Sequence, residues 1–136
     1  MRILLLLMPL WLIGAPQINW YKDFASARKS ATEQHKPIMV FYESKHCKWC
    51  KKMLSVTLQN SKIVRKLNSL VIAVKAHKEK EDYPKHIFSK YAPTIFFLDE
   101  YNQNIIRPIL GYWDADSFIY YIKDLKRALL KRANGS

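Results

Sequence analysis

Residues 38–53 of this chain, IMVFYESKHCKWCKKM, hold a run of apolar residues followed by the two cysteines of the sequence. The apolar run, Ile38 to Tyr42, does not alternate with polar residues, which predicts a strand covered on both faces. From Cys47 onward, Cys50 and Met53 recur at helical spacing and predict a helix. The cysteines therefore fall where a buried strand ends and a helix begins, which is where open α/β sheets place their sites.

The sequence on either side of this stretch predicts further helices and strands. We expect a helix over 18–35, capped by Asn19 and ended by Pro37, and a second helical piece after the cap signal Asn60-Ser61. Further strands are predicted at 70–74, 94–98 and 104–109, the last two as a hairpin with Pro108 at an edge. A helical turn is expected over 84–90, and a closing helix after the cap Asp114.

This order predicts one domain over residues 16–136, because 136 residues leave little room for a second. A strand–helix–strand unit followed by a hairpin and a helix describes an α/β fold. We expect a central mixed sheet of about four strands with helices on both faces.

The first residues predict a targeting segment. Arg2 precedes an unbroken apolar run over 3–13, which is shorter than the roughly 20 residues of a membrane span and fits a signal peptide over 1–15. Pro16 disfavours cleavage after Ala15, so an uncleaved, membrane-anchored form is the alternative. We expect an exported protein, periplasmic or otherwise outside the cytoplasm.

The chain is strongly basic, with 23 lysines and arginines against 11 acidic residues and a net charge of +12. Such a charge favours acidic partners by long-range attraction. The basic residues are spread along the sequence, and several fall on the polar face predicted for the last helix, as is typical of a solvated surface. Because export removes most nucleic-acid partners, we expect none.

The spacing of Cys47 and Cys50 favours redox chemistry over a structural role. A bridge this short closes a very small loop and constrains the unfolded chain little. At a helix start, unpaired N–H groups and the helix dipole stabilise a thiolate on the first cysteine, and the second lies one turn on, within reach of a mixed disulfide. His46 and Lys48 are candidates for tuning that thiolate, together with Lys45, Lys51 and Lys52.

Other roles for these residues stay open. A closed zinc site needs four ligands, and the only candidates beyond the two cysteines are histidines that form no second paired motif, so no metal is expected. The alternative function is copper handling by the same cysteines, or a non-catalytic binding module. His46 is either an exposed loop residue or a thiolate-stabilising imidazole. Trp49 either covers the dithiol or docks a partner. Tyr112 and Trp113 are expected to pack in the core.

The cysteine motif after a buried strand, followed about forty residues on by Ala92-Pro93-Thr94 and a hairpin, resembles the thioredoxin fold. The resemblance covers residues 20–130 and extends to secreted thioredoxin-like proteins of the SoxW type. It implies that Cys47 attacks, that Cys50 resolves, and that a cis Pro93 sets the Ala92 backbone beside the dithiol to bind substrate.

The same resemblance implies an exported thiol–disulfide oxidoreductase that needs no cofactor. Its partners would be envelope proteins with thiols or disulfides, and a membrane thiol-electron carrier would supply electrons to it. Reduction is favoured over oxidation of substrates. Isomerase activity is not expected, since the isomerases of the family carry an extra dimerisation domain for which this chain leaves no room. We expect a monomer.

Two positions depart from thioredoxin itself. His46 precedes the pair where thioredoxin has tryptophan, and Lys48-Trp49 replaces Gly-Pro inside it. Phe41 stands six residues before Cys47, where thioredoxin buries an aspartate that serves proton transfer. Glu43 would face the same side of an extended segment and is a candidate substitute for that acid.

Overall fold

A computed structural model of the chain describes residues 14–135. The predicted signal segment over 1–15 lies almost wholly outside these residues. None of the helices within 14–135 combines the length and the apolar character that crossing a membrane requires.

The described residues build one five-stranded mixed sheet in the order β1-β3-β2-β4-β5. Its centre consists of β3 (Ile72–His77), β2 (Ile38–Glu43) and β4 (Thr94–Leu98), and its edges are the short strands β1 (Trp20–Tyr21) and β5 (Ile109–Leu110). Strand β2 runs parallel to β3 and antiparallel to β4. The predicted α/β architecture is confirmed, with one strand more than expected.

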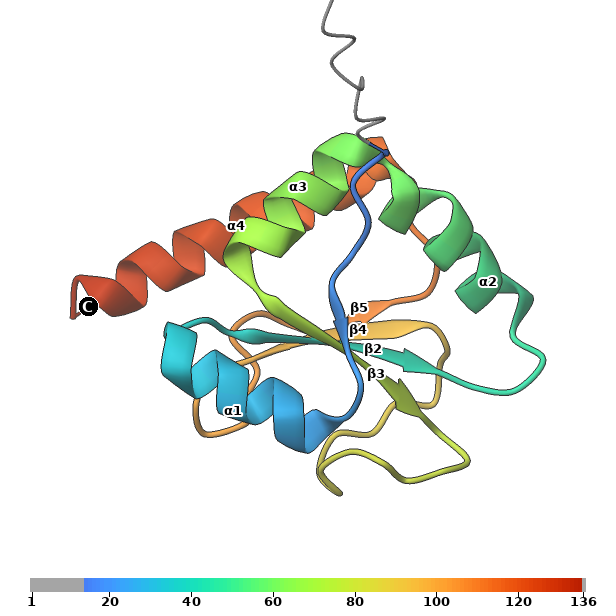
Figure 1. The fold of residues 1–136 in the computed structure, drawn as a ribbon, viewed down its shortest axis with the longest axis horizontal. Helices are drawn as coiled ribbons and strands as arrows, with labels where there is room; N and C mark the ends of the chain where they lie inside the picture. The colour runs from blue at the N-terminus through green and yellow to red at the C-terminus, as the bar shows by residue number, and fades with distance from the viewer. Residues whose placement is uncertain (1–13, 136) are drawn as a thin grey trace, which may run out of the picture.

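Helices cover both faces of this sheet (Figure 1). Helix α1 (Phe24–Gln34) packs on one face, while α2 (Lys48–Ser55), α3 (Ser61–Leu70) and α4 (Ala115–Ala133) lie on the other, with a 3₁₀ turn, η1 (Thr57–Gln59), between α2 and α3. Asn60 caps α3 by accepting from the N–H groups of Lys62 and Ile63, and Asp114 caps α4. Both caps match the sequence prediction.

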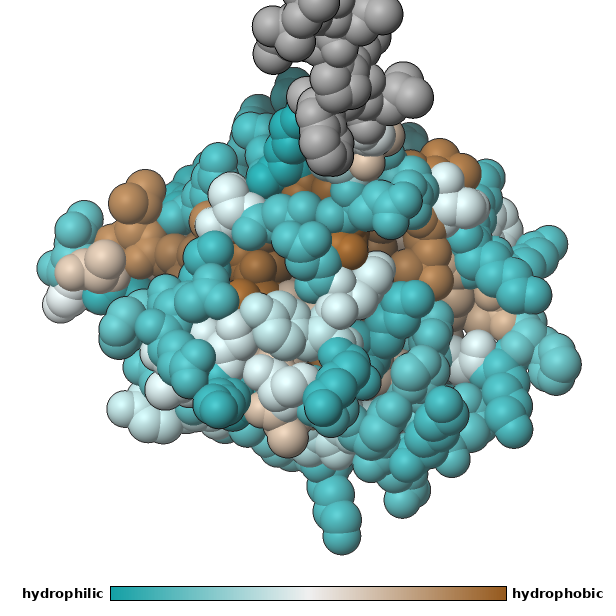
Figure 2. Space-filling view, in the orientation of Figure 1, coloured by the Kyte–Doolittle hydropathy of each residue, from teal (hydrophilic) through white to brown (hydrophobic). Residues whose placement is uncertain are grey.

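The core has two parts because the strands bury side chains on both faces. All of Ile38 to Tyr42 is buried, as the lack of alternation predicts. Met39 and Phe41 face the cluster under α2, α3 and α4, whereas Val40 and Tyr42 face the cluster under α1. Figure 2 shows hydrophilic residues over most of the surface in this view, with hydrophobic residues between α3 and the sheet.

The start of the chain differs from its prediction. Instead of one helix over 18–35 capped by Asn19, Trp20 and Tyr21 form the edge strand β1, paired in parallel with Ala73 and Val74 of β3. The helix begins only at Phe24, where the side chain of Asp23 accepts a hydrogen bond from the N–H of Ser26. Pairing with a strand fifty residues away overrides the helical spacing of the apolar residues.

Two smaller predictions are wrong. Residues 84–90 form turns and bends rather than a helical turn, although the N–H of Ile87 donates to Pro84 O over 2.9 Å. The last strand covers only Ile109–Leu110, with a single bridge from Asn104 to Leu98 before it. Pro108, which has no N–H to donate, therefore lies just outside the strand.

Candidate dithiol site

Cys47 and Cys50 stand at the junction of β2 and α2. Cys47 is the N-cap of α2, and its Sγ accepts a hydrogen bond from the backbone N–H of Cys50 over 3.1 Å. The two cysteines are joined by a disulfide. Cys47 is partly exposed while Cys50 is only 2% exposed and packs in the core. One sulfur is thus accessible at a helix end that favours negative charge, and the other is sheltered behind it.

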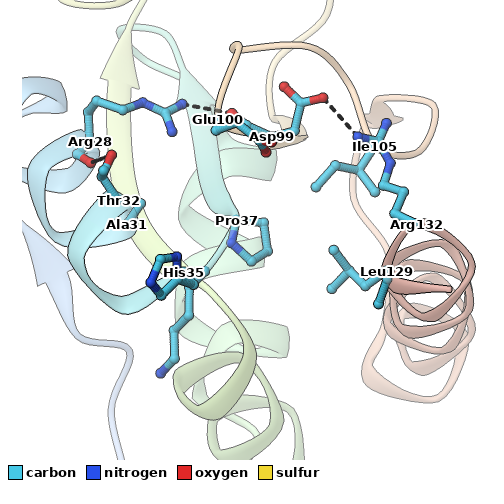
Figure 3. Close-up of a pocket in the computed structure, with 12 residues that line it drawn as sticks. Arg28, Ala31, Thr32, His35, Pro37, Asp99, Glu100, Ile105, Leu129 and Arg132 are labelled. Carbon is cyan, nitrogen blue, oxygen red and sulfur yellow. Dashed lines mark hydrogen bonds and ion pairs between the residues drawn. The ribbon is translucent and has the colours of Figure 1, made fainter. Parts of the chain in front are cut away.

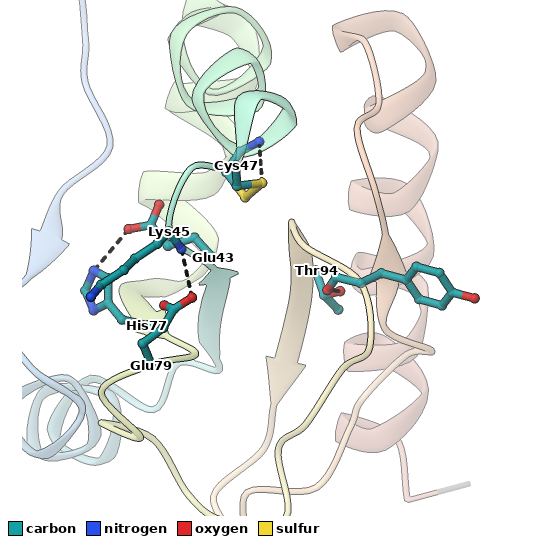
Figure 4. Close-up of a disulfide and its surroundings, with 8 residues drawn as sticks. Glu43, Lys45, Cys47, His77, Glu79 and Thr94 are labelled. Carbon is teal, nitrogen blue, oxygen red and sulfur yellow. Dashed lines mark hydrogen bonds and ion pairs between the residues drawn. A yellow bond between two sulfur atoms is a disulfide. The ribbon is translucent and has the colours of Figure 1, made fainter.

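A hollow of about 270 Å³ opens beside the disulfide (Figure 4). Both cysteines line it, together with the loop before them and the ends of β2 and β3; the lining residues are Glu43, Ser44, Lys45, His46, Cys47, Cys50, Lys51, His77, Glu79 and Lys80. The N–H of Lys45 donates to Oε1 of Glu79 over 2.9 Å. This bond ties the loop before Cys47 to the loop after β3.

An imidazole flanked by two carboxylates forms one wall of the hollow. His77 Nε2 lies 3.0 Å from Oε1 of Glu43, and its Nδ1 lies 2.8 Å from Oδ2 of Asp82. Burial alone would raise the pKa of Asp82, but hydrogen bonds from the backbone and ring of His77 hold that pKa below its ordinary value. The sequence singles out Glu43, and His77 only as one of the histidines considered for a metal site; the pairing of the two follows from the register of β2 and β3, where they lie opposite each other.

The position of the buried acid of thioredoxin is filled by an aromatic ring. Phe41 is fully buried in the same cluster as Cys50, and its ring packs edge-on against Trp20 at 6.0 Å. Glu43 lies two residues further along β2 and so points to the same face as Phe41. The carboxylate of Glu43 is therefore displaced by two residues toward the end of β2, where Glu43 lines the hollow together with Cys50.

The Ala92–Pro93 peptide bond is cis, as the resemblance implies. Because Thr94 pairs with Tyr42 in the antiparallel pair β2–β4, Pro93 lies at the end of the sheet where β2 leads to the cysteines. Figure 4 shows Thr94 at the start of β4 across from Cys47. Ala92 and Cys47 pack against the same core cluster. The structure thus brings the two separated motifs of the sequence to one end of the sheet.

Trp49 forms an aromatic and cationic group with residues of α2 and the loop after β5. Its side chain is 46% exposed, and its ring centroid lies 5.8 Å from that of Tyr112. Lys48 and Lys52 each place Nζ 5.3 Å from the Trp49 ring, and Lys52 Nζ lies 4.7 Å from the ring of Tyr112. Tyr112 is partly buried and packs against the core cluster, as expected, but its contact with Trp49 could not be predicted from the local sequence.

His46 has a left-handed backbone conformation, with φ 55°, and an exposed side chain. Histidine is among the residues that tolerate this region. Its side chain lines the hollow. Within residues 14–135, no three histidine, cysteine, aspartate or glutamate side chains converge as a metal site would require.

Comparison with known proteins identifies the family. A family model described as thioredoxin-like matches residues 19–100, which include the cysteine pair and Ala92-Pro93. The chain belongs to the thioredoxin-like family. No curated protein matches it in sequence.

Solved structures share the fold of this thioredoxin-like protein at low sequence identity. A DsbH oxidoreductase has a TM-score of 0.66 at 20% identity, covering 88% of this chain and 92% of its own. A putative disulphide-isomerase from Bacteroides thetaiotaomicron has a TM-score of 0.63 at 22% identity, covering 85% and 96%. The oxidised C-terminal domain of DsbD from Neisseria meningitidis has a TM-score of 0.58 at 20% identity, covering 73% and 89%.

A second hollow of this thioredoxin-like protein, of about 500 Å³, contains none of the predicted site residues (Figure 3). It lies between α1, the turn after β4 and the end of α4. Arg132 Nη1 donates to Oδ2 of Asp99 over 2.9 Å, and Arg28 donates to the carbonyl of Asp99. Burial would raise the pKa of Asp99, but hydrogen bonds from the N–H of Gln103 and from Arg132 hold it below its ordinary value. These contacts brace the three elements.

Proposed function

We propose that this chain is an exported thiol–disulfide oxidoreductase that acts on envelope proteins through Cys47 and Cys50. The observation that carries the proposal is the disulfide at the start of α2, with one accessible and one sheltered sulfur, beside the cis Ala92–Pro93 bond. This arrangement separates the roles of attack and resolution between two sulfurs, as thiol exchange requires.

The reaction starts from the reduced dithiol in the favoured direction. The thiolate of Cys47 attacks one sulfur of a substrate disulfide, forms a mixed disulfide and expels the other substrate sulfur as a thiolate. Cys50, once deprotonated, attacks Sγ of Cys47 and expels the second substrate thiolate. Two electrons pass to the substrate, and the protein is left with the Cys47–Cys50 disulfide seen in the structure.

Groups around the pair support each step. The N–H of Cys50 and the end of α2 stabilise the thiolate of Cys47, and the neighbouring His46 and Lys48 tune it. Trp49, Ala92 and Pro93 form the surface that receives the substrate chain. Glu43 takes the proton of Cys50, in place of the acid that Phe41 displaces.

The oxidised protein must be reduced again, and we assign this step to a membrane thiol-electron carrier on the same side of the membrane. Export through residues 1–15 would place both proteins together. The SoxW-type resemblance supports reduction over oxidation of substrates, and the protein acts as a monomer without a cofactor.

Trapping of the mixed disulfide tests this function. A Cys50→Ala variant expressed in the native envelope should accumulate disulfide-linked adducts on Cys47, because the resolving thiol is gone. The matched Cys47→Ala variant should trap none, since Cys50 is buried. Absence of adducts from both variants would overturn the proposed function, and tight metal binding by the reduced pair would replace it with metal handling.

A further inference from the structure

The surface beside the dithiol carries lysines that an aromatic ring holds in place. Lys48 and Lys52 are one helical turn apart, so both lie along the same side of α2. The ring of Trp49 stands 5.3 Å from both Nζ atoms, and the ring of Tyr112 stands 4.7 Å from that of Lys52. Contact with an aromatic face restrains a lysine while leaving its N–H groups free to meet an anion.

No carboxylate of the protein neutralises these lysines among the residues that the structure describes. Helix α2 contains Lys48, Lys51 and Lys52 and no acidic residue. Among the described residues, ion pairs form on His77, Arg127 and Arg132, and no lysine of α2 takes part in one. The two glutamates that line the hollow beside the disulfide are already engaged, Glu43 by His77 and Glu79 by the N–H of Lys45.

We propose that the preferred substrates carry acidic side chains near their reactive cysteine, and that Lys48 and Lys52, positioned by Trp49, bind those carboxylates. The inference rests on the proposed function and names its substrate class. A ring face flanked by two cations suits a segment with both acidic and apolar residues. The net charge of +12 would steer such a segment toward the protein over longer range.

A nearby positive charge also changes the chemistry of Cys47 for every substrate, so the test must separate docking from thiolate stabilisation. The ratio of the rates for two peptide substrates separates them, because a change in the reactivity of the Cys47 thiolate alters both rates by the same factor. The probes are two synthetic peptides that contain one internal disulfide and differ only two residues away from each cysteine, with glutamate in one and glutamine in the other.

The measurement is the rate constant for oxidation of the reduced protein by each peptide, from acid quench and mass spectrometry. We expect the glutamate peptide to react about 5-fold faster at low salt, and the ratio to approach one at about 0.5 M NaCl, where screening is strong. In the double variant Lys48→Gln/Lys52→Gln the low-salt ratio should fall below about 2.

The matched control is Lys22→Gln/Lys29→Gln, which removes the same charge from exposed positions in and before α1, on the opposite face of the sheet. This control variant should keep the wild-type ratio of the glutamate-peptide rate to the glutamine-peptide rate. Circular dichroism should show that both double variants are folded. A ratio near one in the unchanged protein, or an equal fall in both double variants, would overturn the inference.

Three further outcomes identify what has failed. If the glutamine peptide and the neutral 2-hydroxyethyl disulfide both react while the glutamate peptide gains nothing, the substrate class is wrong and the proposed function stands. If none of the three disulfides oxidises the protein, the proposed function itself fails. A ratio that falls as protein concentration rises would show that a second copy of the chain covers this surface, and would overturn the inference in favour of self-association.

Discussion

The backbone N–H of Cys50 donates a hydrogen bond to Sγ of Cys47 over 3.1 Å. The N-cap residue of α2 is therefore also the more exposed cysteine of the disulfide. A helix end that donates to a sulfur stabilises that sulfur as an anion. The two cysteines therefore differ in charge preference as well as in exposure, since Cys50 is 2% exposed.

This difference predicts unequal reactivity in the reduced protein. We expect iodoacetamide to modify Cys47 at least about 10-fold faster than Cys50 near neutral pH, because only Cys47 combines thiolate character with access. Peptide mass spectrometry after brief alkylation measures both rates. As a reference, both cysteines should be labelled equally fast in the unfolded protein. Equal rates in the folded protein would contradict the assignment of Cys47 as the attacking and Cys50 as the resolving thiol.

His46 is predicted to stabilise the thiolate of Cys47. His46→Asn is the informative substitution, because asparagine also tolerates the left-handed backbone found at φ 55° but carries no imidazole. Alkylation of Cys47 should slow by roughly 2-fold or more in the variant, because asparagine cannot carry the positive charge that an imidazolium would place beside the thiolate. An unchanged rate over the whole pH range would leave His46 as an exposed loop residue only.

Glu43 is predicted to accept the proton of Cys50 when the mixed disulfide is resolved. Glu43→Gln should slow release of the substrate by at least about 10-fold and alter its pH profile, while the first attack by Cys47 keeps its rate. Single-turnover kinetics with a protein disulfide separate the two steps. The matched control is Glu79→Gln, which removes a carboxylate from the same hollow. A similar slowing of substrate release in both variants would show that either substitution disturbs the structure of the hollow, and would contradict a specific role for Glu43.

Asp99 is predicted to stabilise the fold through its ion pair with Arg132 at the second hollow. Asp99→Asn keeps an oxygen for the turn but loses the charged bond, so the free energy of unfolding at neutral pH should fall by about 1–2 kcal/mol. Because the folded pKa of Asp99 lies below its ordinary value, the stabilisation is present above that ordinary value and is lost as pH falls through the folded one.

The difference in unfolding free energy between Asp99→Asn and the unchanged protein should therefore shrink in acid. Urea unfolding at neutral pH and at successively lower pH measures it. Glu33→Gln, at an exposed position of α1, serves as the control for loss of one charge. A difference that stays constant down to about pH 2 would contradict the linkage.

Local pattern was enough to place the elements around the dithiol. The unbroken apolar run Ile38 to Tyr42 predicts the central strand, and the caps Asn60 and Asp114 mark the starts of α3 and α4. These signals succeed because burial and capping are set within a few residues of the chain. The junction of strand, cysteines and helix follows directly from them.

What the sequence could not predict depends on pairing between distant segments. Trp20 and Tyr21 fit a helix locally but gain backbone hydrogen bonds from β3, which made the expected helix over 18–35 wrong at its start. Tyr112 meets Trp49 and Lys52 from sixty residues away. His77 joins Glu43 only through the register of β2 and β3. Each contact is fixed by topology, which local patterns do not encode.

The reduction potential of the Cys47–Cys50 pair tests the central claim most directly. The purified protein would be equilibrated with thiol–disulfide buffers, and its redox state read by alkylation and mass spectrometry. We predict a reversible two-electron couple between about −300 and −100 mV, in its lower half if the protein reduces its substrates. Failure of the pair to exchange with any buffer in that range would contradict the assignment of this chain as a thiol–disulfide oxidoreductase.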